Sequence, residues 1–261
     1  KILELALNNG IDPLTNKKVG IETGDPGQFQ DFDALYEAFR KQLEYIVDLK
    51  IRVNNYIERM YASHAPAPFL SVVINDCIKN GKDYYNGGPR YNTNYIQCCG
   101  IGTVTDSLSA IKKHVFETKT VLMDDLLAAL EDNFAGQKAL RLRLLNKTPF
   151  FGNDEDAPDV LMRKVYADLF GAIDGKPNTK GTTYHLNMLS TTCHVYFGKV
   201  IGATPNGRYD GDPISHGSNP DPRFRAYGAP TAMALAIASV QPGYGNAAPM
   251  QIELDPALSR D

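Results

Sequence analysis

The stretch Gly87-Gly88-Pro89-Arg90-Tyr91-Asn92-Thr93-Asn94-Tyr95-Ile96-Gln97 decides the fold, and it continues through Cys98-Cys99-Gly100-Ile101-Gly102 into Asp106-Ser107-Leu108-Ser109-Ala110-Ile111-Lys112. The paired glycines predict a turn that needs a positive φ, and Arg90 is expected to tie neighbouring backbone carbonyls. The stretch lacks the GxGxxG and Walker spacings, so it predicts no phosphate cradle. We expect a strand over residues 95–104 and a helix over residues 106–115.

Outward from this stretch, predicted helices alternate with predicted strands. Apolar residues recur at steps of three and four from about residue 33, which predicts a long amphipathic helix that ends before Pro66. Further helices are expected over residues 2–7, 69–79, 124–134, 137–145 and 158–170, and further strands over 182–188 and 195–201. This alternation predicts an α/β architecture.

The C-terminal part of the chain has a different composition. Residues 202–231 and 241–250 are rich in Gly, Pro, Asn and Asp, and an apolar stretch over 232–240 separates them. Long irregular segments inside a compact enzyme usually line a site or an interface. We expect these segments to do so here.

Charge and composition exclude several classes of partner. The chain has 27 basic and 30 acidic residues and a net charge of -3, and no run of Lys and Arg is longer than two. Neither nucleic acid nor an anionic membrane surface is therefore an expected partner. No apolar run approaches the roughly 18 residues of a membrane span, and no leader-like segment is visible. We expect a cytoplasmic protein that is one large domain or part of one.

The residue types that usually bind metals or act as nucleophiles show no productive spacing. The four cysteines are Cys77, Cys98, Cys99 and Cys193, with no CxxC pair, so the sequence predicts neither a zinc site nor a disulfide framework. The five histidines show no HxH or HxxxH spacing, and a GxSxG elbow is absent. We therefore expect no metal and no hydrolase triad.

Several blocks, in a consistent order, resemble the glycyl radical enzyme superfamily, and most of all its hydroxyproline dehydratase branch. Besides residues 87–97, the blocks are Lys1-Ile2-Leu3-Glu4-Leu5, Gly20-Ile21-Glu22-Thr23-Gly24-Asp25-Pro26, Asn146-Lys147-Thr148-Pro149 and Gly202-Ala203-Thr204-Pro205-Asn206-Gly207-Arg208. Residues 212–220 and 243–250 depart from the pattern usual in the dehydratases. The resemblance therefore identifies the superfamily more firmly than the substrate.

The resemblance implies a fold and a position for the catalytic groups outside these residues. It implies a ten-stranded α/β barrel built from two half-barrels, of which residues 1–261 supply part of the second, with a glycyl radical domain after Asp261. The catalytic cysteine is expected upstream of Lys1 and the radical glycine downstream of Asp261. No catalytic residue is then expected within the chain, which alone should be inactive.

The same resemblance implies the reaction and the partners. A thiyl radical would take a hydrogen atom from a small polar substrate, which then loses water or another leaving group. The implied partners are a radical-SAM activating enzyme that installs the radical, the rest of the parent polypeptide and a second copy in a homodimer, with no bound cofactor. Two alternatives stay open: another glycyl radical lyase, such as a formate C-acetyltransferase, or a noncatalytic subunit or degenerate paralogue.

Two pairs of residues are candidates for the cavity wall. Adjacent cysteines relay a radical in pyruvate formate-lyase, but there the pair precedes a segment resembling residues 1–24, whereas Cys98 and Cys99 follow it. We interpret them as small fillers that line the cavity. Thr191 and Thr192, which precede the predicted strand 195–201, are candidate substrate contacts. The alternative for both threonines is ordinary β-branched strand packing.

Overall fold

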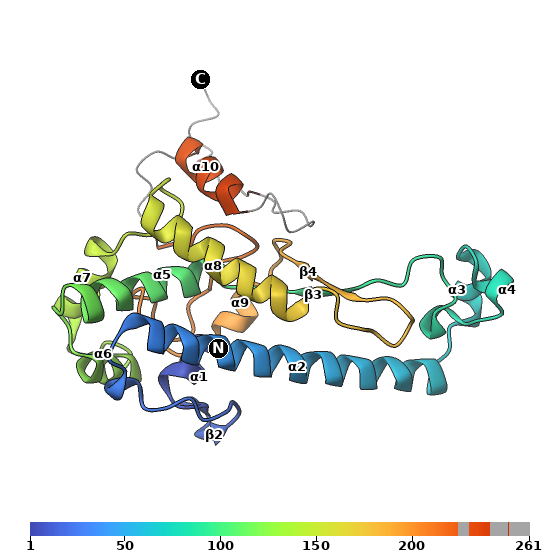
Figure 1. The fold of residues 1–261 in the computed structure, drawn as a ribbon, viewed down its shortest axis with the longest axis horizontal. Helices are drawn as coiled ribbons and strands as arrows, with labels where there is room; N and C mark the ends of the chain where they lie inside the picture. The colour runs from blue at the N-terminus through green and yellow to red at the C-terminus, as the bar shows by residue number, and fades with distance from the viewer. Residues whose placement is uncertain (224–229, 241–249, 251–261) are drawn as a thin grey trace.

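The computed structural model describes residues 1–223, 230–240 and 250. Most of its helices gather in a body, from which one long arm projects (Figure 1). The arm consists of the far half of helix α2 (Phe32–His64) and, at its tip, α3 (Pro68–Val73) and α4 (Cys77–Asn80). Of the segments predicted to be irregular, residues 224–229 and 241–249 lie outside the described residues.

Helix α2 confirms the predicted long amphipathic helix. Asp31 caps it, because its carboxylate accepts a hydrogen bond of 2.8 Å from the Ala34 amide. The apolar stripe is buried as far as Ile51, and Phe39 and Leu43 pack in the core. In the second half, Ile57 and Met60 continue the stripe but are 45% and 42% exposed. The sequence period therefore predicts the helix but not where the body ends.

The tip of the arm corrects one prediction. Residues 69–79 do not form a single helix, because Asp76 has a φ of 75° and separates α3 from α4. Val72 and Val73, which the predicted helix would bury, are exposed, whereas Cys77 is buried as expected. Gly81 ends α4 in the left-handed region, as its position predicts.

The paired glycines form the predicted turn. Gly87 has a φ of 76°, and a Cβ on Gly88 would lie 2.2 Å from the Lys82 carbonyl oxygen, so a side chain does not fit there. The prediction for Arg90 is wrong, because its guanidinium pairs with the Asp76 carboxylate at 2.9 Å instead of tying backbone carbonyls. The side chain of Asn80 donates to the Gly88 carbonyl instead.

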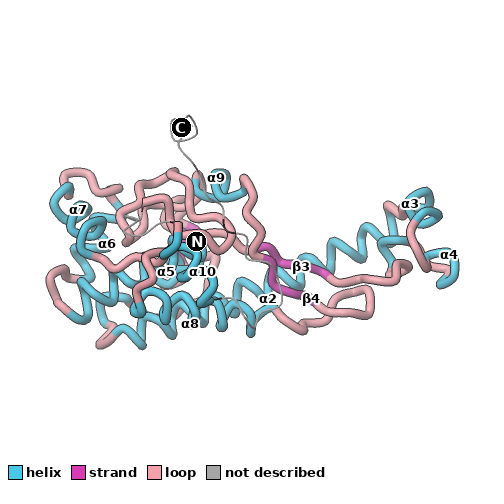
Figure 2. Tube along the Cα trace, turned by 90° about the horizontal axis from the view of Figure 1, so that it is seen from above, coloured by secondary structure: helices cyan, strands magenta, loops and turns pink. Residues whose placement is uncertain are grey.

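Two short strands form a parallel sheet between the arm and the body. Strand β3 (Asn94–Gln97) pairs with β4 (Tyr184–Asn187), with Asn94 opposite Tyr184 and Gln97 opposite Asn187. Both strands lie beside α2 (Figure 2). Strand β4 confirms the prediction for 182–188. A separate antiparallel pair, β1 (Ile11–Asp12) and β2 (Lys17–Lys18), follows helix α1 (Ile2–Leu7), which is also confirmed.

The predicted strand over 95–104 is too long. Gly100 has a φ of 86°, and α5 (Ile101–Ile111) begins directly after it. The Ser215 hydroxyl accepts a hydrogen bond of 3.0 Å from the Thr103 amide, which satisfies one free donor of the helix N-terminus. Because this partner lies 112 residues away, local sequence patterns could not place the start of α5.

The core of the body lies around α8 (Asp156–Ile173), which packs against α2, α5 and α10 (Thr231–Val240). The side chains of Leu108, Met162 and Tyr166 are almost completely buried there. A π-helical turn (Lys112–Glu117) extends α5. The remaining predicted helices are confirmed as α6 (Met123–Glu131), α7 (Lys138–Lys147) and α8. None of the helices within the described ranges combines the length and the apolar character that crossing a membrane requires.

The predicted strand over 195–201 is wrong, because residues Cys193–Gly198 form the short helix α9. The fully buried Arg208 explains the difference. Its guanidinium donates to the carbonyl oxygens of Gly198 at 2.7 Å and Gly202 at 2.6 Å, and also to those of Ile201 and Asp212. Four carbonyls that converge on one guanidinium hold this backbone in place, so the arginine supports an irregular path that the β-branched local sequence does not indicate.

Candidate functional site

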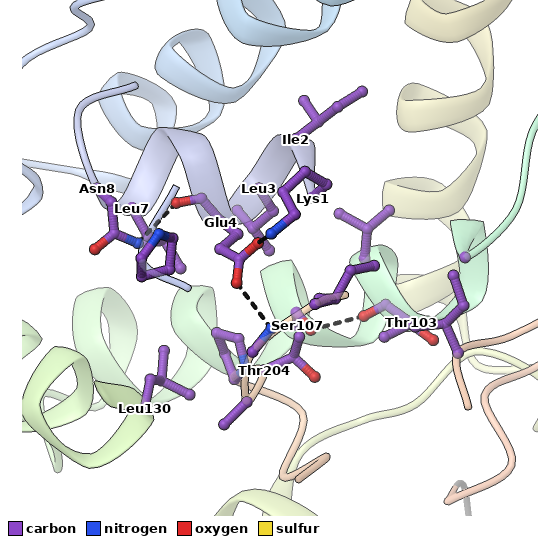
Figure 3. Close-up of a pocket in the computed structure, with 18 of the residues that line it drawn as sticks. Lys1, Ile2, Leu3, Glu4, Leu7, Asn8, Thr103, Ser107, Leu130 and Thr204 are labelled. Atoms are coloured by element: carbon purple, nitrogen blue, oxygen red, sulfur yellow. Dashed lines mark hydrogen bonds and ion pairs between the residues drawn. The ribbon is translucent and has the colours of Figure 1, made fainter. Parts of the chain in front are cut away.

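A cavity of about 1200 Å³ opens into the body. Its wall combines α1, the segment that follows β3, the start of α5, one side of α6 and the loop after α9. Most of the wall is apolar. Figure 3 shows Leu3, Leu7 and Leu130 on this wall, together with the hydroxyl side chains of Thr103 and Ser107. A large, mainly apolar cavity with few polar groups is typical of a small-molecule site.

The buried Glu4 ties two walls of the cavity together. Its carboxylate accepts a hydrogen bond of 2.8 Å from the Gly202 amide and forms an ion pair of 2.5 Å with the Lys1 ammonium (Figure 3). Lys1 also pairs with Asp12 at 2.9 Å. Because both oxygens of Glu4 are engaged within the protein, this carboxylate fixes the loop after α9 against α1. Sequence reasoning placed Glu4 in a family block but gave it no role.

The carboxyl ends of β3 and β4 meet at one edge of the sheet, as in any parallel pair. Gln97, the last residue of β3, donates from its side-chain nitrogen to the Leu189 carbonyl oxygen at 2.9 Å and to Thr191 Oγ1 at 3.0 Å. Gln97 lines the cavity, so this contact joins the segment after β4 to the cavity wall. Sequence reasoning missed Gln97, because no local signal distinguishes it from any other strand residue.

Thr191 and Thr192 differ in their environments. Thr191 is half-buried, and its hydroxyl oxygen accepts from Gln97 and, at 3.4 Å, from the Cys193 amide. Thr192 is exposed and is the residue at which α9 begins, so it does not precede a strand. The substrate contact predicted for these threonines stays a prediction.

Cys98 and Cys99 are among the residues that line the cavity. Burial raises the pKa of the Cys98 thiol to about 12. Burial and the neighbouring Cys193 also raise the pKa of the Cys99 thiol, while a hydrogen bond with the Thr191 side chain opposes this. Both cysteines are therefore neutral thiols near pH 7, which does not favour a nucleophilic thiolate.

His194 and His216 lie side by side near this edge, with ring centroids 4.8 Å apart. A ring nitrogen of His194 lies 2.7 Å from the Thr191 carbonyl oxygen, so His194 holds the local backbone. Within residues 1–223, 230–240 and 250, no group of three or more His, Cys, Asp or Glu side chains is arranged to hold a metal ion.

Comparison with known proteins gives consistent matches. Residues 1–198 match the family model described as pyruvate formate lyase-like. The chain is 49% identical over 240 residues to trans-4-hydroxy-L-proline dehydratase of Clostridioides difficile, which covers 92% of the chain and 30% of that protein.

Two crystal structures extend the likeness to the fold. A structure of hydroxyproline dehydratase from Clostridioides difficile with trans-4-hydroxy-L-proline bound matches with a TM-score of 0.88 at 48% identity, over 92% of the chain and 30% of that protein. A glycyl radical enzyme from Archaeoglobus fulgidus matches with a TM-score of 0.78 at 34% identity, over 85% and 28%. The chain therefore spans about 30% of the length of the first of these relatives.

Proposed function

The chain belongs to the pyruvate formate lyase-like family and carries part of the α/β barrel fold of glycyl radical enzymes, and from this premise we propose that it forms one wall of the active site of a glycyl radical dehydratase. The observation that carries the proposal is the likeness to hydroxyproline dehydratase over 92% of the chain. The proposed reaction takes a hydrogen atom from a small polar substrate and expels water or another leaving group. The proposed substrate class is that of trans-4-hydroxy-L-proline.

We place the reactive groups outside these residues. The catalytic cysteine belongs upstream of Lys1, the radical glycine belongs to a domain downstream of Asp261, and the barrel domain spans residues 1–261. The glycyl radical, once installed by a radical-SAM activating enzyme, would take the hydrogen atom of the cysteine thiol, and the resulting thiyl radical would take one from the substrate. The cavity wall suits this chemistry, since it is mainly apolar and limits access of water to the reacting atoms.

The residues of this chain bind and orient the substrate. The Thr191 hydroxyl oxygen accepts hydrogen bonds from Gln97 and from the Cys193 amide, and we propose that this oriented hydroxyl also contacts the substrate. Thr192, which is exposed, is proposed as a second contact. The neutral thiols of Cys98 and Cys99 fill the wall beside them without adding charge. We also propose a homodimer in the cytoplasm.

The test uses the full-length parent protein and its activating enzyme under anaerobic conditions. Electron paramagnetic resonance should detect a glycyl radical doublet, and incubation with trans-4-hydroxy-L-proline should yield a product lighter by one water. Absence of the doublet, under conditions that activate hydroxyproline dehydratase itself, would contradict the proposal and favour a noncatalytic subunit or degenerate paralogue. A doublet without dehydration would retain the family chemistry and exclude this substrate.

A further inference from the structure

The side chain of Gln97 occupies the edge where the two parallel strands end. Its nitrogen has two hydrogens and two acceptors, the Leu189 carbonyl oxygen at 2.9 Å and Thr191 Oγ1 at 3.0 Å. The carbonyl of Leu189 can only accept, so a flipped amide would place two oxygens against each other. The contacts therefore fix which end of the amide faces the segment after β4.

This orientation leaves the amide oxygen on the other side. Within the described residues, no hydrogen bond uses Gln97 Oε1, and Gln97 itself is exposed to the cavity that it lines. Two other polar groups of the wall are already engaged. Glu4 binds Gly202 and Lys1, and the Ser107 hydroxyl donates to the Thr103 carbonyl oxygen at 2.7 Å. Gln97 thus offers an oriented, uncharged acceptor beside the neutral thiols of Cys98 and Cys99.

We propose that Gln97 is a specificity-determining residue whose Oε1 accepts a hydrogen bond from a hydroxyl or protonated amine of the substrate. The inference rests on the proposed function, because it assigns this cavity to a small polar substrate. It adds a chemical requirement, namely that the substrate carries a hydrogen-bond donor at the edge of β3. A site built to accept from such a donor discriminates against an analogue that lacks it, because the acceptor is then left unpaired.

The alternative role for Gln97 is structural: its side chain would only hold the end of β3 against the segment after β4. Substrate analogues separate the two roles. Binding is measured by calorimetry on the full-length, unactivated protein with trans-4-hydroxy-L-proline, with trans-4-fluoro-L-proline, which lacks the hydroxyl donor, and with N-methyl-trans-4-hydroxy-L-proline, which lacks one ammonium hydrogen. The variant is Gln97→Met, which has a similar length but no amide. The control is Gln28→Met, at an exposed glutamine on the short turn Pro26–Gln28.

The proposal expects non-additive effects. One of the two analogues, the one that lacks the donor facing Gln97, should bind the parent protein and Gln28→Met about tenfold more weakly than trans-4-hydroxy-L-proline does. The same analogue should bind Gln97→Met less than about twofold more weakly than trans-4-hydroxy-L-proline does. An equal loss of affinity for all three ligands in Gln97→Met would assign Gln97 a structural role and overturn the inference. A parent protein that binds none of the three ligands would also overturn the inference. These outcomes are independent of the radical signal, which tests the proposed function separately.

Discussion

Thr103 and Ser215 hydrogen-bond each other twice. The Thr103 amide donates to Ser215 Oγ at 3.0 Å, and the Ser215 amide donates to Thr103 Oγ1 at 2.8 Å. Both residues are buried. The Thr103 hydroxyl also donates to Asp221, so one pair of residues attaches the irregular segment after α9 to the start of α5. The cavity wall therefore depends on this attachment.

Replacing Ser215 with alanine should loosen the first turn of α5. The Thr103 amide would lose its partner in a buried position, which costs on the order of 1–2 kcal/mol. Hydrogen exchange of the full-length protein, followed by mass spectrometry, should show faster exchange in peptides that begin α5. Ser218→Ala is the matched control, because the Ser218 hydroxyl is buried and has no hydrogen-bond partner among the described residues. Equal protection in both variants would contradict the capping role.

Replacing Arg208 with lysine should be strongly destabilising despite the retained charge. Lysine cannot reproduce the fork that reaches four carbonyl oxygens, so buried acceptors are left unpaired. The expected cost is about 3–5 kcal/mol, as for a broken buried polar network. Thermal unfolding of the full-length protein checks this. Arg52→Lys, in an exposed ion pair with Asp48, should change the midpoint little, and a comparable loss in both would argue against the buried network.

Asp159 should make stability depend on pH in an unusual direction. Burial and the nearby Asp154 raise the pKa of this carboxyl from 3.8 to about 6. The folded state holds the proton more tightly than the unfolded state does. The contribution of Asp159 to the free energy of unfolding should therefore be fully present below pH 3.8. It should fall as pH rises toward about 6.

The variant Asp159→Asn removes this titration. Its free energy of unfolding should exceed that of the parent protein by on the order of 2 kcal/mol at pH 7 and match it near pH 4, as denaturant unfolding at each pH measures. Asp154→Asn should shift the same window to lower pH, since one repelling charge is removed. An Asp159→Asn variant that is no more stable than the parent at pH 7 would show that folding does not raise the pKa of this carboxyl.

Thr191→Val should weaken substrate binding while leaving the fold intact. Valine keeps the shape but removes the hydroxyl, and we expect KM to rise about tenfold from the lost hydrogen bond. Thr191→Ser, which restores the hydroxyl, should recover most of the affinity. The measurement is steady-state dehydration by the activated full-length protein, with equal radical content in each sample. If Thr191→Ser is as impaired as Thr191→Val, the hydroxyl is not the group that binds.

Cys98 should react slowly with alkylating reagents. The half-buried position of its thiol raises the pKa to about 12, so the thiolate fraction near pH 8 is very small. Iodoacetamide labelling, followed peptide by peptide, should be at least about tenfold slower in the folded protein than in urea. Rapid labelling of folded Cys98 would mean that the wall around it opens readily.

Sequence patterns predicted the regular elements well where packing is local. Helix α2 follows from its apolar period and α8 from its own pattern, because each buries one stripe of side chains against the body. The patterns failed where distant residues decide the backbone. The strand expected over 195–201 is helix α9, whose C-terminal carbonyl binds Arg208.

The candidate site was predictable only in part. The family blocks directed attention to Cys98 and Cys99, which line the cavity, and to Thr191 at the same edge of the sheet. Gln97 and Glu4 carry no signal in their local sequence. Their roles depend on partners 92 and 198 residues away, at Leu189 and Gly202. Only the assembled fold brings these groups together.

The pairing of β3 with β4 has a consequence for how the protein reaches its native state. The strands join segments about 90 residues apart, as the hydrogen bond from Thr182 to Asn92 illustrates. Such distant pairing is entropically costly before other contacts form, so we infer that the helices associate early and the strand edge is completed late. A nascent polypeptide would then display its binding residues only after nearly the whole of this region had left the ribosome.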